Sequence, residues 1–267
     1  MSERPLWSRQ YDSESWMPFT VEVDGHPLAC NLNPDPERGA DATLCVIPTQ
    51  ALNVVEDPAR MTIKPNVMSE WLDRLAAAGA SILLVHGKWF DSLSELAERV
   101  GSGLDWFEGM ERRIAGAISE SLRRGYVKPG KIVVMGSSRH GFAILHAAAS
   151  NPDVSAAVAH QPIVSWPRMV EFAGMDDDPI VERHSLYNRI DEFAPRPVMI
   201  QTGYADERVG QDQLEALINP MAHAYAERGV GNRFFHDLMD IPGHDGMRIP
   251  DSALDGVVPW LQQQGML

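Results

Sequence analysis

The sequence predicts an α/β fold with a mostly parallel central sheet and helices on both of its faces. Two observations support this prediction. Short apolar runs, typical of strands buried on both faces, alternate along the chain with longer segments whose apolar residues recur at helical spacing. The 267 residues, of which 44% are hydrophobic, can also bury a substantial core. We expect one domain over residues 1–267.

The N-terminal strands are predicted to form an antiparallel hairpin at the border of the sheet. Residues 19–25 and 26–32 alternate in side-chain character around Asp24-Gly25, a pair typical of tight hairpin turns. Further strands are predicted over residues 42–48, 82–85, 132–134, 156–159, 197–201 and 233–237, and helices over 66–79, 105–124, 142–149 and 250–264. A helical segment between the last two strands is expected to be interrupted at Asn219-Pro220.

Residues 163–196 interrupt the regular alternation of strands and helices. They contain Trp166, Met169 and Phe172, followed by an acidic turn. We interpret this segment as a small helical cap over the site, with a simple crossover loop as the alternative.

Composition excludes several classes of partner. The net charge of −14 disfavours nucleic acid and anionic membrane surfaces. No apolar run is long enough to cross a bilayer and the N-terminus lacks a signal-peptide core, so we expect a cytoplasmic protein. Cys30 and Cys45 lie in strand-like runs and are expected to be buried free thiols. Because metal-ligand and phosphate-loop motifs are absent from the sequence, no metal and no organic cofactor is expected.

The clearest candidate for chemistry lies at residues 131–151. A β-branched run ends in the turn GSSRHG, and an apolar helical segment follows at once. A serine at the tip of such a strand–turn–helix is typical of a nucleophile elbow, where free helix N–H groups can stabilise an oxyanion. Ser138 fits this motif better than Ser137. The motif needs a small residue two positions before the serine, and Ser137 has Met135 there. His140 replaces the usual second glycine, and an ordinary helix N-cap is the alternative interpretation.

A serine nucleophile needs a base, and the base needs an acid that orients it. Because ligand chemistry occurs at the carboxyl ends of strands, we searched the loops after the later strands. Asp206 follows the strand at 197–201, and His244 follows the strand at 233–237. Glu207 is an alternative acid, although the motif register favours Asp206.

These three motifs resemble those of the α/β-hydrolase superfamily, most closely its prolyl-oligopeptidase/dienelactone-hydrolase-like branch. The pattern G-x-S-x-G-G matches residues 136–141 except at His140, G-x-x-D-x-x-V matches 203–209, and the late G-H matches 243–244. The resemblance covers essentially the whole chain and implies the α/β-hydrolase fold. It also implies that Ser138 attacks a carbonyl carbon, that His244 moves the proton, and that Asp206 fixes the imidazole tautomer.

The resemblance further implies an oxyanion hole made of two backbone N–H groups. Arg139 would supply the first. The second would come from Thr49 or Gln50, because Pro48 has no N–H. The expected pocket residues are Trp89, Phe90, His140, His160 and Trp166.

The expected function is therefore a serine hydrolase, and in particular a carboxylesterase on small or medium esters. The peptidases of the family often carry a propeller domain, and because none fits in this chain esters are favoured. A peptidase or amidase of the same fold is one alternative, and a non-catalytic binder of small ligands is another. A homodimer is the assembly to test, because exposed sheet edges and apolar cap faces often support dimers.

Overall fold

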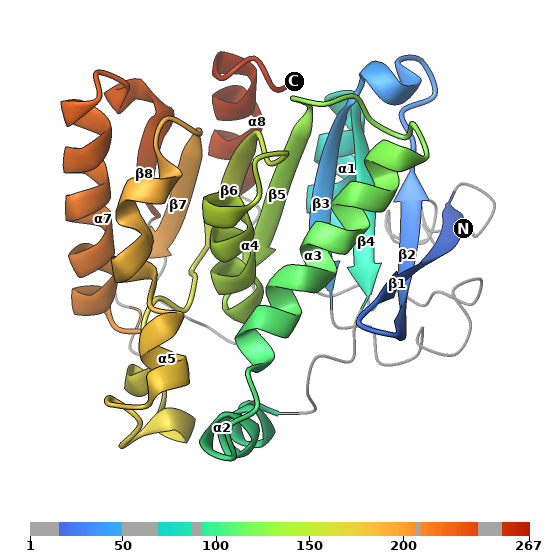
Figure 1. Ribbon diagram of the computed structural model, residues 1–267. Coiled ribbons are helices and arrows are strands. Elements are labelled where there is room, and N and C mark those ends of the chain that lie inside the picture. Colours follow the sequence, from blue (N-terminus) through green and yellow to red (C-terminus); the bar gives the residue numbers. More distant parts are fainter. Residues whose placement is uncertain (1–15, 50–68, 87–91, 205, 207–208, 240–252) are drawn as a thin grey trace, which may run out of the picture. The chain divides into compact units, whose positions relative to one another are not determined.

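The computed structural model describes residues 16–49, 69–86, 92–204, 206, 209–239 and 253–267 (Figure 1). In this part of the chain, eight strands form one sheet with the order β1-β2-β4-β3-β5-β6-β7-β8. The strands are β1 Met17–Val23, β2 His26–Asn33, β3 Thr43–Thr49, β4 Ala80–His86, β5 Ile132–Ser137, β6 Ala156–His160, β7 Val198–Gly203 and β8 Phe234–Met239. The predicted α/β fold is confirmed, with the hairpin antiparallel and the later strands mostly parallel.

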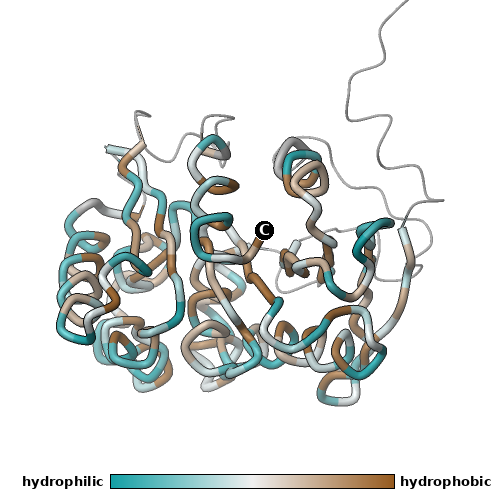
Figure 2. The backbone as a smooth tube through the Cα atoms, turned by 90° about the horizontal axis from the view of Figure 1, so that it is seen from above, coloured by the Kyte–Doolittle hydropathy of each residue, from teal (hydrophilic) through white to brown (hydrophobic). Residues whose placement is uncertain are grey.

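The predicted helices are present, and the structure adds α2, which the sequence analysis did not predict. The α-helices are α1 Ser69–Ala77, α2 Leu93–Gly101, α3 Trp106–Arg123, α4 Arg139–Ser150, α5 Pro179–Arg183, α6 Ile190–Phe193, α7 Gln211–Glu227 and α8 Ala253–Gln263. Hydropathy alternates along the helices, as expected for helices with one face toward a core (Figure 2). Every described helix is too short or too polar to span a lipid bilayer.

The chain divides into two compact units, so the single-domain assignment stays a prediction. The first unit takes residues 1–88, 113–133 and 248–267, and the second takes residues 89–112 and 134–247. Each unit is described by itself below.

The first unit is built around β1 to β4. The hairpin pairs Val21 with Leu28, and β2 continues antiparallel to β4. In β3 and β4 every residue except Thr49 is buried, which explains their continuous apolar sequences. Helix α1 lies behind these strands and the C-terminal part of α3 lies in front (Figure 1). The thiols Cys30 and Cys45 are both free and buried, as predicted, and burial raises the pKa of each to about 12.

The second unit contains the carboxyl-terminal half of β5 and the parallel strands β6, β7 and β8. Helix α4 lies in front of β5 and β6 (Figure 1), and eight of its twelve residues are buried. This burial accounts for the alanine-rich sequence of α4, because small side chains let the helix pack closely on the sheet. Residues 163–196 form short helices, as predicted. Whether they cap the site stays a prediction.

The predicted interruption at Asn219-Pro220 is wrong, because α7 continues through both residues. Proline cannot donate a hydrogen bond to the carbonyl of Ala216, one turn earlier. Since Ala216, Asn219 and Pro220 are all exposed, water can bind that carbonyl and the helix need not break.

Candidate active site

Ser138 lies at the junction of β5 and α4 in the conformation of a nucleophile elbow. Its φ of 54° and ψ of −121° fall in a region that residues other than glycine rarely adopt. The Ser138 N–H donates to the carbonyl of His160 at 3.0 Å. The Ser138 carbonyl accepts from the N–H groups of Phe142 and Ile163, both at 3.1 Å. Both peptide groups of Ser138 are therefore held by neighbouring structure.

The N-cap alternative does not fit this geometry. An N-cap serine has extended backbone angles and accepts a hydrogen bond from the first helical turn. Ser138 has a positive φ, and its side chain makes no capping hydrogen bond. The side chain is partly exposed, so its hydroxyl is available for chemistry.

Two glycines make the elbow sterically feasible. A Cβ atom at Gly136 would lie 2.7 Å from the carbonyl oxygen of His140. A Cβ atom at Gly141 would lie 2.9 Å from the Cβ of Pro162. Both distances are shorter than real Cβ contacts, so a side chain at either position requires the turn to move.

Arg139 and His140 begin helix α4. The Arg139 N–H belongs to the first helical turn, where N–H groups have no partner within the helix. It is thus well placed for the predicted oxyanion role, which stays a prediction. Burial, and then the charge of Arg139, lower the pKa of His140 to about 3. Because His140 is neutral and only weakly basic near pH 7, it is poorly suited to act as the general base.

Asp206 is buried, with 2% of its surface exposed, in the loop that follows β7. Its Oδ1 accepts from the Val209 N–H at 3.0 Å, and its carbonyl accepts from the Gly210 N–H at 2.9 Å. These bonds close a turn that fixes the carboxylate. Ser138 and Asp206 therefore follow strands that are separated in the sheet by β6 alone. The predicted base, His244, lies outside the described residues.

The other predicted site residues have different surroundings. His160 is fully buried at the end of β6, where its carbonyl binds the Ser138 N–H. Trp166 is buried within an aromatic cluster, and its ring lies 4.9 Å from those of Phe107 and Phe172. Gln50, Trp89 and Phe90 lie outside the described residues, so their proposed roles stay predictions.

Thr49 ends β3 in the first unit, beside a buried histidine of β4. The Thr49 Oγ1 lies 3.1 Å from the Nδ1 of His86, and the His86 Nε2 lies 2.9 Å from the Oδ1 of Asn31. Since an amide oxygen can only accept, His86 donates to Asn31 and accepts from Thr49. Burial lowers the pKa of His86 to about 4, so this relay is neutral at physiological pH.

Sequence reasoning missed Gln161, which directly follows β6. Its φ is 41°, and only 2% of its surface is exposed. The Gln161 N–H donates to the carbonyl of Gln201 at 2.7 Å. Its side-chain Nε2 is buried without a hydrogen-bond partner in the described structure. The sequence signal was only its place at the carboxyl end of a predicted strand.

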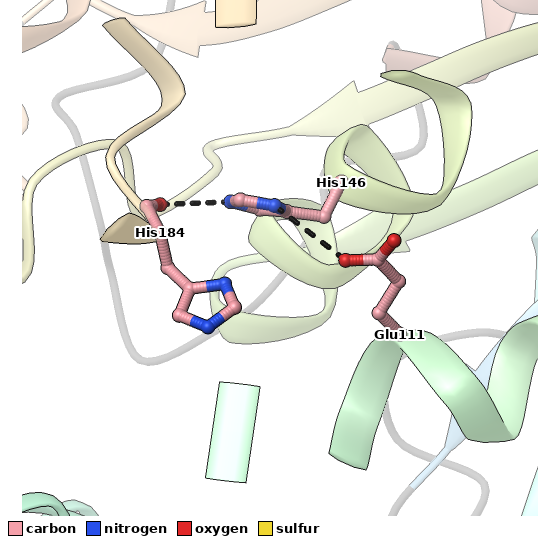
Figure 3. Close-up of side chains that lie close together, drawn as sticks. All are labelled: Glu111, His146 and His184. Atoms are coloured by element: carbon pink, nitrogen blue, oxygen red, sulfur yellow. Dashed lines mark hydrogen bonds and ion pairs between the residues drawn. The ribbon is translucent and has the colours of Figure 1, made fainter. Parts of the chain in front are cut away.

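A second polar group lies among α3, α4 and the end of α5 (Figure 3). Glu111, His146 and His184 place ligand atoms within 4.8 Å of one another, a donor set that would suit zinc. However, Arg189 Nη1 lies 2.9 Å from His146 Nδ1 and 3.7 Å from Glu111 Oε2. His146 Nε2 donates to the carbonyl of His184, whose ring bonds Asp105. Since the guanidinium supplies the cation, we interpret this group as a structural polar cluster.

The comparisons with known proteins agree with this geometry. Residues 113–239 match the sequence profile of the prolyl oligopeptidase family. No curated protein matches the chain. Three solved structures illustrate the similarity of fold. A puromycin-hydrolyzing peptidase of Mycobacterium tuberculosis has a TM-score of 0.69 and 15% identity, over 100% of this chain and 42% of that one.

Two shorter proteins are matched over nearly their whole length. A protein of Klebsiella pneumoniae assigned as a dienelactone hydrolase has a TM-score of 0.65 and 15% identity, over 94% of this chain and 98% of that one. An esterase of Pyrococcus furiosus has a TM-score of 0.65 and 13% identity, over 94% of this chain and 92% of that one. This chain thus spans less than half of the M. tuberculosis peptidase but nearly all of the other two.

The sheet order, the elbow and the similar solved structures show that the chain has the α/β-hydrolase fold. Over residues 113–239 the sequence also resembles the prolyl oligopeptidase family, the branch whose motifs the sequence analysis identified.

Proposed function

We propose that this protein hydrolyses small or medium carboxylic esters through an acyl-enzyme formed on Ser138. The observation that supports this most strongly is the backbone of Ser138, whose positive φ is stabilised by hydrogen bonds to two other segments. A rare backbone conformation that neighbouring structure holds in place is typical of a functional residue.

The reaction follows from the proposed roles. The Ser138 oxygen would attack the ester carbonyl carbon while His244 accepts the hydroxyl proton, and Asp206 would orient the imidazole. The carbonyl oxygen would become an oxyanion bound by the N–H of Arg139 and that of Thr49 or Gln50. Collapse would break the bond to the alcohol, which leaves with the proton from His244. Water would then attack the acyl-enzyme by the same steps and release the acid.

Esters are favoured as substrates by the near-complete overlap with the two shorter proteins, one of which is an esterase. Peptide hydrolysis is the second candidate, because the matched profile is that of the prolyl oligopeptidase family. Small-ligand binding without catalysis is the third, and the experiment below distinguishes it.

Labelling with a fluorophosphonate probe tests the proposal. Intact-mass and peptide mapping should place one adduct on Ser138 of the wild-type protein. Ser138→Ala should abolish the adduct, whereas Ser137→Ala, the control at the neighbouring serine, should retain it. Turnover of p-nitrophenyl esters, compared with peptide p-nitroanilides, then separates esterase from peptidase. A folded wild-type protein without an adduct would contradict the proposal and favour ligand binding.

A further inference from the structure

The backbone around Ser138 brings one more polar side chain to the proposed site. The segment from His160 to Ile163 is bound to Ser138 at both of its ends. The His160 carbonyl accepts from the Ser138 N–H, and the Ile163 N–H donates to the Ser138 carbonyl. Gln161 and Pro162 lie between these two bonds. Gln161 is therefore adjacent to the proposed nucleophile, although it is 23 positions later in the sequence.

The conformation of Gln161 is fixed from several sides. Its N–H is bound by the carbonyl of Gln201 at 2.7 Å, and Pro162 packs against Gly141 of the elbow. Its φ of 41° lies in the left-handed region, which disfavours residues with a Cβ atom. A strained backbone in a segment that binds the proposed nucleophile is typical of a functional site.

The side-chain amide of Gln161 ends in a buried hydrogen-bond donor. Its Nε2 is shielded from solvent and has no partner in the described structure. Most buried polar groups are paired, and an unpaired one destabilises the fold. Gln201, on the adjacent strand β7 and fully buried, differs in this one atom, since its Nε2 donates to Asp237 at 2.9 Å.

We propose that Gln161 is a specificity-determining residue whose Nε2 donates a hydrogen bond to an oxygen atom of the substrate near the scissile carbonyl. The inference rests on the proposed hydrolase function. The preferred esters would carry a carbonyl, ether or hydroxyl oxygen close to the reacting bond, and esters with hydrocarbon groups of the same size would react more slowly. A substrate site that contains a buried hydrogen-bond donor discriminates against a ligand that leaves this donor unpaired.

Pairs of esters that differ by one oxygen test this directly. p-Nitrophenyl methoxyacetate and p-nitrophenyl butyrate differ in the acyl part, and 2-methoxyethyl acetate and butyl acetate differ in the alcohol part. For each pair we define the selectivity as the ratio of kcat/KM for the oxygen-containing ester to that for the hydrocarbon ester. Intrinsic reactivity cancels when this ratio is compared between variants.

Gln161→Leu should lower the selectivity on at least one pair by about tenfold, the effect of one neutral hydrogen bond. Its thermal midpoint should stay equal or rise, because the unpaired buried donor is gone. The matched control is Gln201→Leu, which removes a paired amide. It should lower the thermal midpoint and leave both selectivities unchanged. If Gln161→Leu does not fold, Gln161→Gly relieves the positive φ and should show the same loss of selectivity.

Unchanged selectivity on both pairs in either Gln161 variant, with Ser138 still labelled by the fluorophosphonate, would overturn this inference alone. A lower midpoint for Gln161→Leu with unchanged selectivity would indicate a structural role instead. Absence of labelling in the wild-type protein would overturn the proposed function, and this inference with it.

Discussion

The strained backbone of Ser138 depends on the residue two positions before it. Gly136 ends the buried part of β5, and the start of α4 passes directly over its Cα. The nearest atoms to a methyl group introduced at this position would belong to backbone, which cannot rotate away as a flexible side chain could. The glycine is thus required by close approach, since its φ is not positive.

Gly136→Ala should therefore destabilise the protein by about 1–3 kcal/mol, as overpacking typically does, and should also lower labelling of Ser138. Urea unfolding and the labelling rate measure the two effects. Gly109→Ala is the control, because nothing lies within 4 Å of a Cβ atom at that position in α3. It should stabilise the helix by about 0.5–1 kcal/mol. Equal stability of the two variants would refute the steric explanation.

At the scale of elements, α2 shows how a short helix is fixed by its first turn. The Oγ of Ser92 accepts from the Glu95 N–H at 3.1 Å, and Glu95 pairs with Arg99 one turn later at 2.5 Å. Leu96 and Val100 are the buried residues of this helix. Because the buried face is small, the cap contributes a substantial part of the local stability.

Ser92→Ala should lower the free energy of unfolding by about 1 kcal/mol, because an N–H of the first turn loses its acceptor. Ser94→Ala is the matched control, since Ser94 is exposed within the same helix. It should be neutral or slightly stabilising, because alanine has the higher helix propensity. The two unfolding curves should separate clearly, and superimposed curves would show that the cap is dispensable.

The elements that the sequence predicted correctly are those whose signals are local. Asp24-Gly25 encodes its hairpin turn, and continuous apolar runs encode the buried strands. Helix α2 was not predicted, because its apolar face is short. Its Ser92-x-x-Glu95 pattern is nevertheless a capping signal. The interruption predicted at Pro220 is wrong, because the effect of a proline depends on whether its face of the helix is exposed to water. The local sequence does not reveal that exposure.

In the candidate site, too, the residues with a local sequence signal could be predicted and the others could not. The serine elbow carries a local motif, so the position of Ser138 could be predicted from sequence. Asp206 was predicted from motif order, and the structure adds the turn that fixes it. The place of Gln161 beside the elbow could not be predicted, because it arises from hydrogen bonds between β6, β7 and the elbow that no local pattern encodes.

For the molecule as a whole, the buried histidines determine the response to acid. Burial is the main cause that lowers the pKa of His86 to about 4 and of His140 and His146 to about 3. In the unfolded chain a histidine titrates near its ordinary value of about 6.5. As the pH falls below that value the unfolded state binds protons that the folded state does not. Stability is therefore lost as the pH decreases.

The free energy of unfolding should fall by about 2 kcal/mol for each of these three histidines between pH 7 and pH 5, as linkage requires. Urea unfolding at pH 7, 6 and 5 measures the loss. His146→Gln should reduce this fall in the free energy of unfolding by about 2 kcal/mol, the contribution of one histidine. Stability independent of pH over this range would show that the three rings bind protons as readily in the folded protein as in the unfolded chain.

The relay of Thr49, His86 and Asn31 has a consequence for protein engineering. It ties the last residue of β3 to the neighbouring strand β4 and, through His86, to β2, by way of the buried side chains of His86 and Asn31. A segment grafted after residue 49 would thus start from an anchored stem, whatever its length or composition. Libraries that exchange this segment can be built on a constant stem, provided that selection is carried out near neutral pH, where His86 still accepts from Thr49.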